Sequence, residues 1–361
     1  MIRTDTTYEV ICMDISITDF DWPFLDYELP RLNKLSNNLY GASFFLMKLL
    51  PARFTIQHAE ATGKLSRGGH IIETTSGTFG LALAMICAVK KYRLTLISDP
   101  VIDKNLYAQL RELGAVVEIL RTPHPDGGYQ RVRLERLYKL LEEDPDAFWP
   151  DQYGNPYNPM SYGRLAEYLV KRLGRIDCLV GPVGSGGSMV GTTAHLRRVF
   201  PDLKAIAVDT PKSVLFGQRN GERLLRGLGN SLLPKNLDHS MFDYVFWVPA
   251  RMAFQATREL HRVHGLYMGG TSGAAYLVAN WWARQNPGDK VVAIFPDEGH
   301  RYSRTIYNDK WLSKVPGKDY SPELQPLLIQ HPRENEEEWC WMRWNRRRLC
   351  DVISSMVNST T

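Results

Sequence analysis

The chain has 361 residues, of which 44% are hydrophobic and 23% charged, and its formal net charge is +5. This composition is typical of a globular protein, and the length suits about two domains. The net charge is small and no long Lys/Arg run with interleaved aromatic residues is present, so we expect no nucleic-acid partner.

The cysteines predict neither a disulfide framework nor a metal site. Their number is odd and no Cys-x-x-Cys pair occurs, the positions being 12, 87, 178, 340 and 350. The first residues lack a basic region followed by an apolar core, which a signal peptide would have. The longest apolar run, residues 81–89, is far shorter than the ~20 residues that span a bilayer. We therefore expect a cytoplasmic protein without membrane contact.

From about residue 70 onward, short apolar runs alternate with amphipathic segments. The pattern predicts helices at 81–91 and 104–113, and strands at 70–73, 94–97, 116–119, 178–181, 205–208, 245–248 and 291–295. Nearly continuous apolar strands separated by helices indicate an α/β fold with a mostly parallel sheet covered on both faces. In such folds ligands bind beyond the C-terminal ends of the strands.

The chain divides into two predicted lobes and a tail. A segment rich in Pro, Asn, Asp and Gly, residues 144–159, is typical of a crossover between lobes. We place the N-terminal lobe at residues 1–155, the second lobe at 156–325 and a C-terminal helical tail at 326–361. In the tail, apolar residues fall near one face of a helix, opposite Arg343, Arg346 and Arg347; they are Trp341, Trp344, Leu349, Val352, Ile353 and Met356. This helix would dock on its own or a partner subunit, with a membrane-surface or protein-recruitment role as the alternative.

The strongest single motif is Gly184-Ser185-Gly186-Gly187-Ser188, which follows a predicted strand and opens a predicted helix. Glycines let the backbone approach an anion, and the free N–H groups and dipole of the first helical turn attract it, so the loop predicts a phosphate site. A tight turn without a ligand is one alternative. A dinucleotide loop is another, with Asp209 as the ribose-binding acid, although the third glycine of that fingerprint is missing. The absence of a Gly-Lys-Ser/Thr ending excludes a Walker loop.

Two more turns place hydroxyl groups at the starts of predicted helices. Thr74-Thr75-Ser76-Gly77-Thr78 offers hydroxyl and N–H donors that suit a carboxylate. Two anion sites on two lobes indicate two ligands, one with a phosphate and one with a carboxylate. Residues 269–275 form a third such turn, for which a ligand site and a simple packing turn are equally good explanations.

Together these segments resemble the cysteine synthase and cystathionine β-synthase family of pyridoxal-phosphate enzymes, which is similar to the tryptophan synthase β-subunit. The resemblance extends over residues 30–315 and rests on five motifs in the family's order, at 73–77, 184–188, 227–238, 270–275 and 295–302. It implies a fold type II enzyme: two three-layer α/β lobes with mostly parallel sheets, pyridoxal 5'-phosphate in the cleft between them, and a homodimer.

The resemblance also implies roles for single residues. Lys48 stands 28 residues before Ser76, as the family's catalytic lysine does, and would be the Schiff-base lysine that removes the α-proton of the substrate. Its apolar neighbours fit a buried amine with a lowered pKa. The cofactor would be held by Lys48, Thr78, Gly184, Ser185, Gly186, Gly187, Ser188 and Thr271, whose hydroxyl would contact the pyridine nitrogen. The substrate would be held by Thr75, Ser76, Gly77, Gln152 and Gly227.

Two departures from the family pattern concern the lysine and the substrate turn. The loop that usually precedes the lysine is missing, so Lys48 could instead correspond to a lysine of the preceding strand; the longer downstream match favours the catalytic assignment. Thr78 stands where the family has an asparagine, and Phe79 where it has a hydroxyl residue. The substrates therefore need not be O-acetylserine and sulfide.

The resemblance implies an amino-acid biosynthetic enzyme of the cysteine synthase type. The expected reaction is pyridoxal-phosphate-dependent β-replacement on an activated serine, as its O-acetyl or O-phospho ester, by a thiol or an amine. The alternatives are a β-eliminating lyase similar to a cysteine desulfhydrase, and a catalytically impaired homologue that binds a partner protein in the old cleft.

Overall fold

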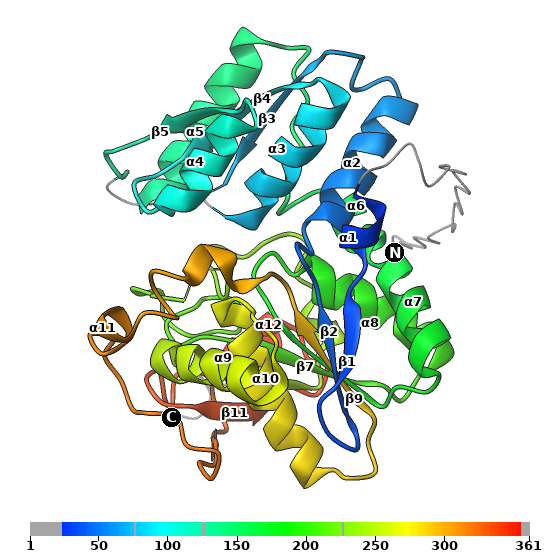
Figure 1. Cartoon of the computed structure of the whole chain (residues 1–361), viewed down its shortest axis with the longest axis vertical. Helices are drawn as coiled ribbons and strands as arrows, with labels where there is room; N and C mark the ends of the chain where they lie inside the picture. The colour runs from blue at the N-terminus through cyan, green and yellow to red at the C-terminus, as the bar shows by residue number, and fades with distance from the viewer. Residues whose placement is uncertain (1–23, 76, 125–127, 226, 355–361) are drawn as a thin grey trace.

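Two β-sheets organise the chain in the computed structural model, which describes residues 24–75, 77–124, 128–225 and 227–354 (Figure 1). Among these residues, three parallel strands form a small sheet: β3 (His70–Thr74), β4 (Arg93–Ser98) and β5 (Val116–Ile119). Eight strands form a larger sheet, in the order β1 (Arg31–Lys34), β2 (Leu39–Ser43), β9 (Val291–Phe295), β6 (Cys178–Pro182), β7 (Lys204–Asp209), β8 (Tyr244–Trp247), β11 (Cys340–Arg343) and β10 (Leu327–Leu328).

The interior of the larger sheet is parallel. Strands β2, β9, β6, β7 and β8 run in the same direction, whereas β1 and β11 are antiparallel to their neighbours β2 and β8. All five residues of β9 are buried. Val291, Ala293 and Phe295 pack into one hydrophobic cluster, and Val292 and Ile294 pack into the cluster on the opposite face. The apolar run in the sequence thus reflects a strand that is covered on both sides.

Helices cover both faces of each sheet. On the larger sheet, α9 (Ala250–His264) and α10 (Gly270–Gln285) pack on one face, and α7 (Gly163–Leu173) and α8 (Gly187–Val199) on the other. On the small sheet, α2 (Leu49–Ala61), α3 (Thr78–Lys90) and α4 (Lys104–Glu112) lie on one face, and α5 (Gly128–Glu143) on the other. The short helices are α1 (Leu25–Glu28), α6 (Tyr157–Ser161), α11 (Asp309–Leu312) and α12 (Leu349–Ser354). None of the helices in these ranges is long and apolar enough to cross a membrane.

The strands predicted from apolar runs are confirmed to within a residue or two at each end, and so is the mostly parallel α/β fold. Strands β1 and β2 were not predicted. Both precede Phe44 in the chain but belong to the larger sheet, where β2 pairs with β9 and β1 pairs with β2. The chain therefore enters the small-sheet lobe only after them. The lobe boundary at residue 155 remains a prediction.

The predicted tail helix is wrong for residues 340–343, which form strand β11. Cys340 and Met342 pack into one hydrophobic cluster, and Trp341 packs against the other, which is the alternation of a strand. The strand pairs with β8 and satisfies that strand's otherwise open backbone groups. Among the tail residues up to 354, which the structure describes, a helix forms only at α12, and Met356 lies outside the described residues.

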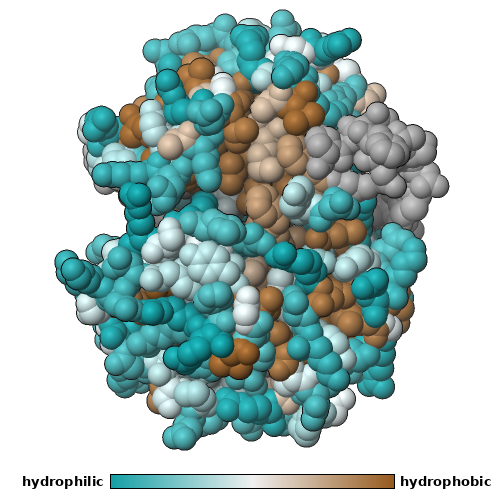
Figure 2. All heavy atoms as spheres, in the orientation of Figure 1, coloured by the Kyte–Doolittle hydropathy of each residue, from teal (hydrophilic) through white to brown (hydrophobic). Residues whose placement is uncertain are grey.

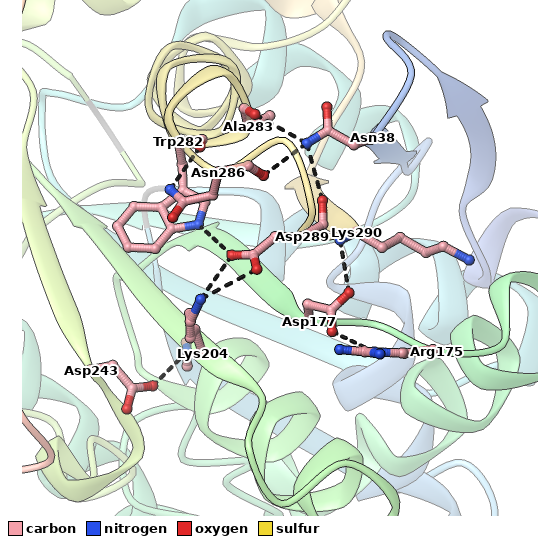
Figure 3. Close-up of polar contacts among 11 residues, drawn as sticks. Asn38, Arg175, Asp177, Lys204, Asp243, Trp282, Ala283, Asn286, Asp289 and Lys290 are labelled. Atoms are coloured by element: carbon pink, nitrogen blue, oxygen red, sulfur yellow. Dashed lines mark hydrogen bonds and ion pairs between the residues drawn. The ribbon is translucent and has the colours of Figure 1, made fainter.

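A polar network closes the edge of the larger sheet where the strands β6, β7 and β9 begin (Figure 3). The Asn38 side-chain amide donates to the carbonyl oxygens of Ala283, Asn286 and Asp289 at 3.0–3.1 Å. The Asp289 carboxylate accepts from Lys204 Nζ at 3.0 Å. The polar groups at this edge therefore bond to one another. Ligands are expected at the opposite edge, where the parallel strands end.

Candidate active site

A cavity of about 460 Å³ lies between the small and the larger sheet. Its walls come from segments that follow the C-terminal ends of β2, β3, β6, β7 and β9, together with α5 and α10. This is the edge at which parallel sheets bind ligands. Most of the residues predicted to bind cofactor or substrate line it: Lys48, Thr75, Gly77, Thr78, Gln152, Gly184, Ser185, Ser188, Gly227 and Thr271.

Lys48 occupies the residue before α2, outside strand β2, which ends at Ser43. Its ammonium group lies at the cavity wall and donates to the Ser185 hydroxyl, with 3.4 Å between Nζ and Oγ. Burial lowers the pKa of Lys48 to about 8. An amine with this pKa is partly neutral near pH 8, so it can act as a nucleophile or base.

The glycines of the loop between β6 and α8 stand where there is no room for a side chain. Gly186 has a φ of +82°, and a Cβ atom there would lie 2.8 Å from Leu237 Cα. The Cβ position of Gly184 lies 3.1 Å from the Gly227 carbonyl oxygen. Ser185 and Ser188 line the cavity, whereas Gly186 and Gly187 do not and instead shape the loop behind it. The first N–H groups of α8 therefore start beside the cavity without partners inside the helix.

The substrate turn follows β3 and is braced by a buried carboxylate. The Thr75 hydroxyl accepts from the Gly77 N–H at 3.1 Å. Glu73 is 1% exposed and accepts from the backbone N–H of Gln152 at 3.2 Å, which ties that residue to the end of β3. Burial raises the pKa of Glu73 to about 7. Ser76, predicted to contact substrate, lies outside the described residues.

Gln152 joins the two sides of the cavity. Its carbonyl oxygen accepts from the side-chain amides of Asn158 at 2.6 Å and Asn236 at 3.1 Å. Across the cavity, Thr271 lies in the first turn of α10, and the Cβ position of Gly227 lies 3.6 Å from its methyl group. The crossover segment and the glycine-rich stretch around Gly227 thus meet at one site.

Asp209, the residue considered for a dinucleotide ribose, is fully buried and does not line the cavity. It accepts from the Thr210 N–H at 2.8 Å, and burial raises its pKa to about 7. Its position supports the loop that follows β7 and leaves it no access to a ribose in the cavity.

Two cationic residues of the cavity wall, Arg133 and Arg223, were not predicted from the sequence. Arg133 lies on the charged helix α5, where nothing in the amphipathic pattern distinguishes it from its neighbours. Arg223 stands four residues before Gly227, and this proximity to a motif was the available signal. Asp297 and Arg301, which belong to the predicted motif at 295–302, also line the cavity. The Asp297 carboxylate and the Arg301 guanidinium form an ion pair at 3.3 Å.

A family model described as "Pyridoxal-phosphate dependent enzyme" matches residues 34–297, well over half of the chain. The chain belongs to this family. It is therefore an enzyme of the cysteine synthase type that uses pyridoxal phosphate, and the predicted family, fold class and cofactor are confirmed. The predicted reaction class is also confirmed: β-replacement on a serine-derived substrate by a thiol or an amine.

Curated relatives of this pyridoxal-phosphate enzyme include two with the same name. The chain is 35% identical to the N-(2-amino-2-carboxyethyl)-L-glutamate synthase of Cupriavidus metallidurans, over 77% of this chain and 83% of that one. It is 37% identical to the synthase of that name from Ralstonia nicotianae, over 73% and 79%. Among solved structures, an O-acetylserine dependent cystathionine beta-synthase from Helicobacter pylori is 28% identical with a TM-score of 0.73, covering 81% of this chain and 99% of that one.

The cavity fits the cofactor of this family in shape and in charge. The tight loop at Gly184 and Gly186 leaves backbone donors at the start of α8 for a phosphate. Lys48 places a partly neutral amine within the same cavity, and Thr271 adds a hydroxyl from the start of α10. When bound there, pyridoxal phosphate supplies an electron sink for the carbanion that forms when a substrate loses its α-proton.

Proposed function

We propose that this enzyme joins an activated serine to the amino group of a second amino acid, with glutamate as the nucleophile. The observation that carries the proposal is the positive lining of the cavity, where Arg133, Arg223 and Arg301 accompany Lys48. Two amino acids bring several carboxylates that these cations can bind, whereas sulfide needs none of them. The names of the two relatives that are 35% and 37% identical support the same pair of reactants.

In the proposed reaction, one bond at Cβ of the serine breaks and another forms, and residues of the cavity hold the reactants and move the proton. The bond between Cβ of the activated serine and its ester oxygen breaks, and a bond forms between Cβ and the amine nitrogen, which gives up a proton. In this proposal Lys48 removes the α-proton and later returns it. Thr75, Ser76, Gly77 and Gln152 hold the serine carboxylate, with Gly227 beside the substrate, and Thr78 and Thr271 contact the cofactor ring. The loop residues Gly184, Ser185, Gly186, Gly187 and Ser188 hold the cofactor phosphate.

The leaving group in this proposal is phosphate, so the first substrate is O-phosphoserine. Arg133 supports it, because its side chain is 12% exposed and its Nε–H is a buried donor without a partner in the described part of the chain. Its Nη1 already pairs with Asp99 Oδ2 at 3.2 Å, which fixes the guanidinium at the cavity wall. An unpartnered buried donor beside the cavity suits a phosphate oxygen better than a neutral acetyl group.

The proposal is tested by incubating the cofactor-loaded enzyme with either serine ester and with glutamate or sulfide. We expect glutamate and O-phosphoserine to give phosphate and N-(2-amino-2-carboxyethyl)-glutamate in equal amounts, measured by mass spectrometry. Faster turnover with sulfide would reject the amine nucleophile. Release of keto acid in the absence of any nucleophile, at the full rate, would identify a β-eliminating lyase instead.

An Arg133→Gln variant is expected to raise the KM for O-phosphoserine by about 10- to 100-fold, since one charge-assisted contact is worth roughly 1.5–3 kcal/mol. The KM for O-acetylserine, measured in the same assay, should change less than threefold. Arg131→Gln is the matched control, because Arg131 lies on the same helix and is 53% exposed. Equal losses with both esters would mean that Arg133 does not select the phosphate.

We also propose a homodimer. Phe45, Leu81 and Met85 on α3, and Leu113 directly after α4 form a shallow apolar groove. Figure 2 shows apolar side chains gathered over this part of the small-sheet lobe. A contiguous exposed apolar patch is typical of a subunit interface. Light scattering should give twice the monomer mass of 41.3 kDa, and a monomer at micromolar concentration would reject the proposal.

Cytoplasmic location and the lack of a nucleic-acid partner stay predictions.

A further inference from the structure

Arg223 differs from the other two arginines of the cavity in its partners. Arg133 pairs with Asp99, and Arg301 pairs with Asp297. Within the described ranges, no carboxylate lies at ion-pair distance from Arg223, and partial burial lowers its pKa. The buried Asp209 carboxylate acts on Arg223 from a distance and partly offsets this lowering, but it forms no ion pair with it. A partly buried cation without a direct ion pair at a cavity wall can bind an anionic group.

The contacts of Arg223 hold its guanidinium without neutralising it. One Nη donates to the Ser231 hydroxyl at 2.5 Å, and the other donates to the carbonyl oxygens of Gly221, at 3.0 Å, and Lys212. The second Nη also donates to the Asn220 amide oxygen at 3.1 Å, and all four acceptors are uncharged. The guanidinium is therefore fixed in direction, and its positive charge remains available to a ligand in the cavity.

The backbone of Lys212 connects Arg223 to a buried glutamine. The Lys212 carbonyl that accepts from Arg223 also accepts from the Gly221 N–H at 3.1 Å. The Lys212 N–H donates to Gln218 Oε1 at 2.9 Å. The Gln218 side chain is 2% exposed, and its Nε2 donates to the Asn335 carbonyl oxygen at 3.0 Å. These bonds form a continuous path from the C-terminal tail to the guanidinium.

The tail also contacts residues 216–219 of the loop that contains Gln218. Glu336 accepts from the Arg219 N–H at 2.8 Å, and Arg333 Nε donates to the Gly217 carbonyl oxygen at 3.1 Å. The rings of Phe216 and the fully buried Trp344 meet edge to face, with 5.2 Å between their centroids. All of these tail residues lie beyond residue 297, where the match to the family model ends.

We infer that Arg223 binds a carboxylate of the amino-acid nucleophile, and that the C-terminal tail positions Arg223 through Asn335, Gln218 and Lys212. The inference rests on the proposed function, since it assigns the nucleophile of that reaction to this side of the cavity. Arg223 is the specificity-determining residue, and Gln218 is a positioning residue that touches no substrate. The part of the chain outside the matched family segment thus takes part in choosing the second substrate.

The first test is Arg223→Gln in the cofactor-loaded enzyme. The KM for glutamate should rise at least tenfold, while the KM for O-phosphoserine changes less than twofold. With an amine that carries no carboxylate as the nucleophile, wild type and variant should have the same kcat/KM. Arg175→Gln is the control, because Arg175 is 78% exposed and pairs with Asp177 at the opposite edge of the sheet. An unchanged KM for glutamate overturns the inference.

The second test is Gln218→Met, which keeps the side-chain volume and removes both hydrogen bonds. We expect the KM for glutamate to rise about three- to tenfold with kcat unchanged. In the cofactor-free protein, hydrogen exchange should become faster across residues 212–223. Gln285→Met is the control, since Gln285 is an exposed glutamine at the C-terminal end of α10. A lower melting temperature without a selective rise in the KM for glutamate would show a merely structural glutamine and overturn the role of the tail.

Failure of the inference can be told apart from failure of the proposed function. If the wild-type enzyme uses sulfide and not glutamate, both are overturned. If it uses glutamate and Arg223→Gln retains the wild-type KM for glutamate, the proposed function stands and the inference alone is overturned.

Discussion

A Lys48→Met variant is expected to lose β-replacement activity by roughly 10³-fold or more, because the proposed Schiff-base partner and the base for the α-proton are the same amine. The ammonium of Lys48 lies in the cavity beside Ser185, and burial lowers its pKa to about 8. Methionine keeps the unbranched apolar stem and removes only the amine. Activity is measured with saturating cofactor and both serine esters.

The control is Lys64→Met, which removes an exposed lysine just beyond the other end of α2. This variant should retain wild-type turnover. In the Lys48 variant, the visible absorption of the bound cofactor should also shift to that of the free aldehyde. Turnover within tenfold of wild type, with unchanged absorption, would show that another lysine carries out the chemistry.

The same lysine predicts a pH dependence of folding in the cofactor-free protein. Its pKa is about 8 in the folded chain, against an ordinary value of 10.5. Between these two pH values the unfolded chain binds more protons, so the free energy of unfolding rises with pH across this window. Lys48→Met should remove that rise and be more stable at pH 7, by at most about 3 kcal/mol. Urea titrations at pH 7, 8, 9 and 10 measure the difference, with Lys64→Met following the wild type.

The strands and the ligand loops could be predicted because their signals are local. A buried parallel strand such as β9 is a continuous apolar run, and the loop from Gly184 to Ser188 combines glycines with the start of a helix. Both patterns are complete within a few neighbouring residues. The resemblance to a known family then supplied the order of the motifs and the position of Lys48.

The features that were missed depend on contacts between distant parts of the chain. Residues 340–343 have an apolar spacing that also fits a helix, and their pairing with β8, about 95 residues earlier, makes them a strand. Arg133 and Arg223 are ordinary arginines in their own segments. They become candidate ligand groups only because the folded chain places both at the wall of one cavity. Spacing along the sequence carries no information of this kind.

Gly186→Ala is expected to destabilise the cofactor-free protein by about 2–5 kcal/mol. The φ of +82° at this position costs an alanine roughly 1–2 kcal/mol. Its Cβ would lie 2.8 Å from Leu237 Cα and 2.9 Å from the Asn236 carbonyl oxygen, and moving this backbone adds about 1–3 kcal/mol. Because the loop opens α8, the displacement should also weaken cofactor binding at least tenfold. Urea titration and cofactor titration measure the two effects.

Two further glycines separate these causes. Gly63 has a φ of +70° with no heavy atom within 4 Å of its Cβ position, and Gly288 has open space without a positive φ. Gly63→Ala should therefore lose only about 1–2 kcal/mol, Gly288→Ala should be neutral, and both should bind cofactor like the wild type. If Gly186→Ala is destabilised no more than Gly63→Ala and retains its cofactor affinity, the close packing of this loop has no role in holding the phosphate. A selective loss of affinity in Gly186→Ala would instead tie the cofactor to the backbone at the start of α8.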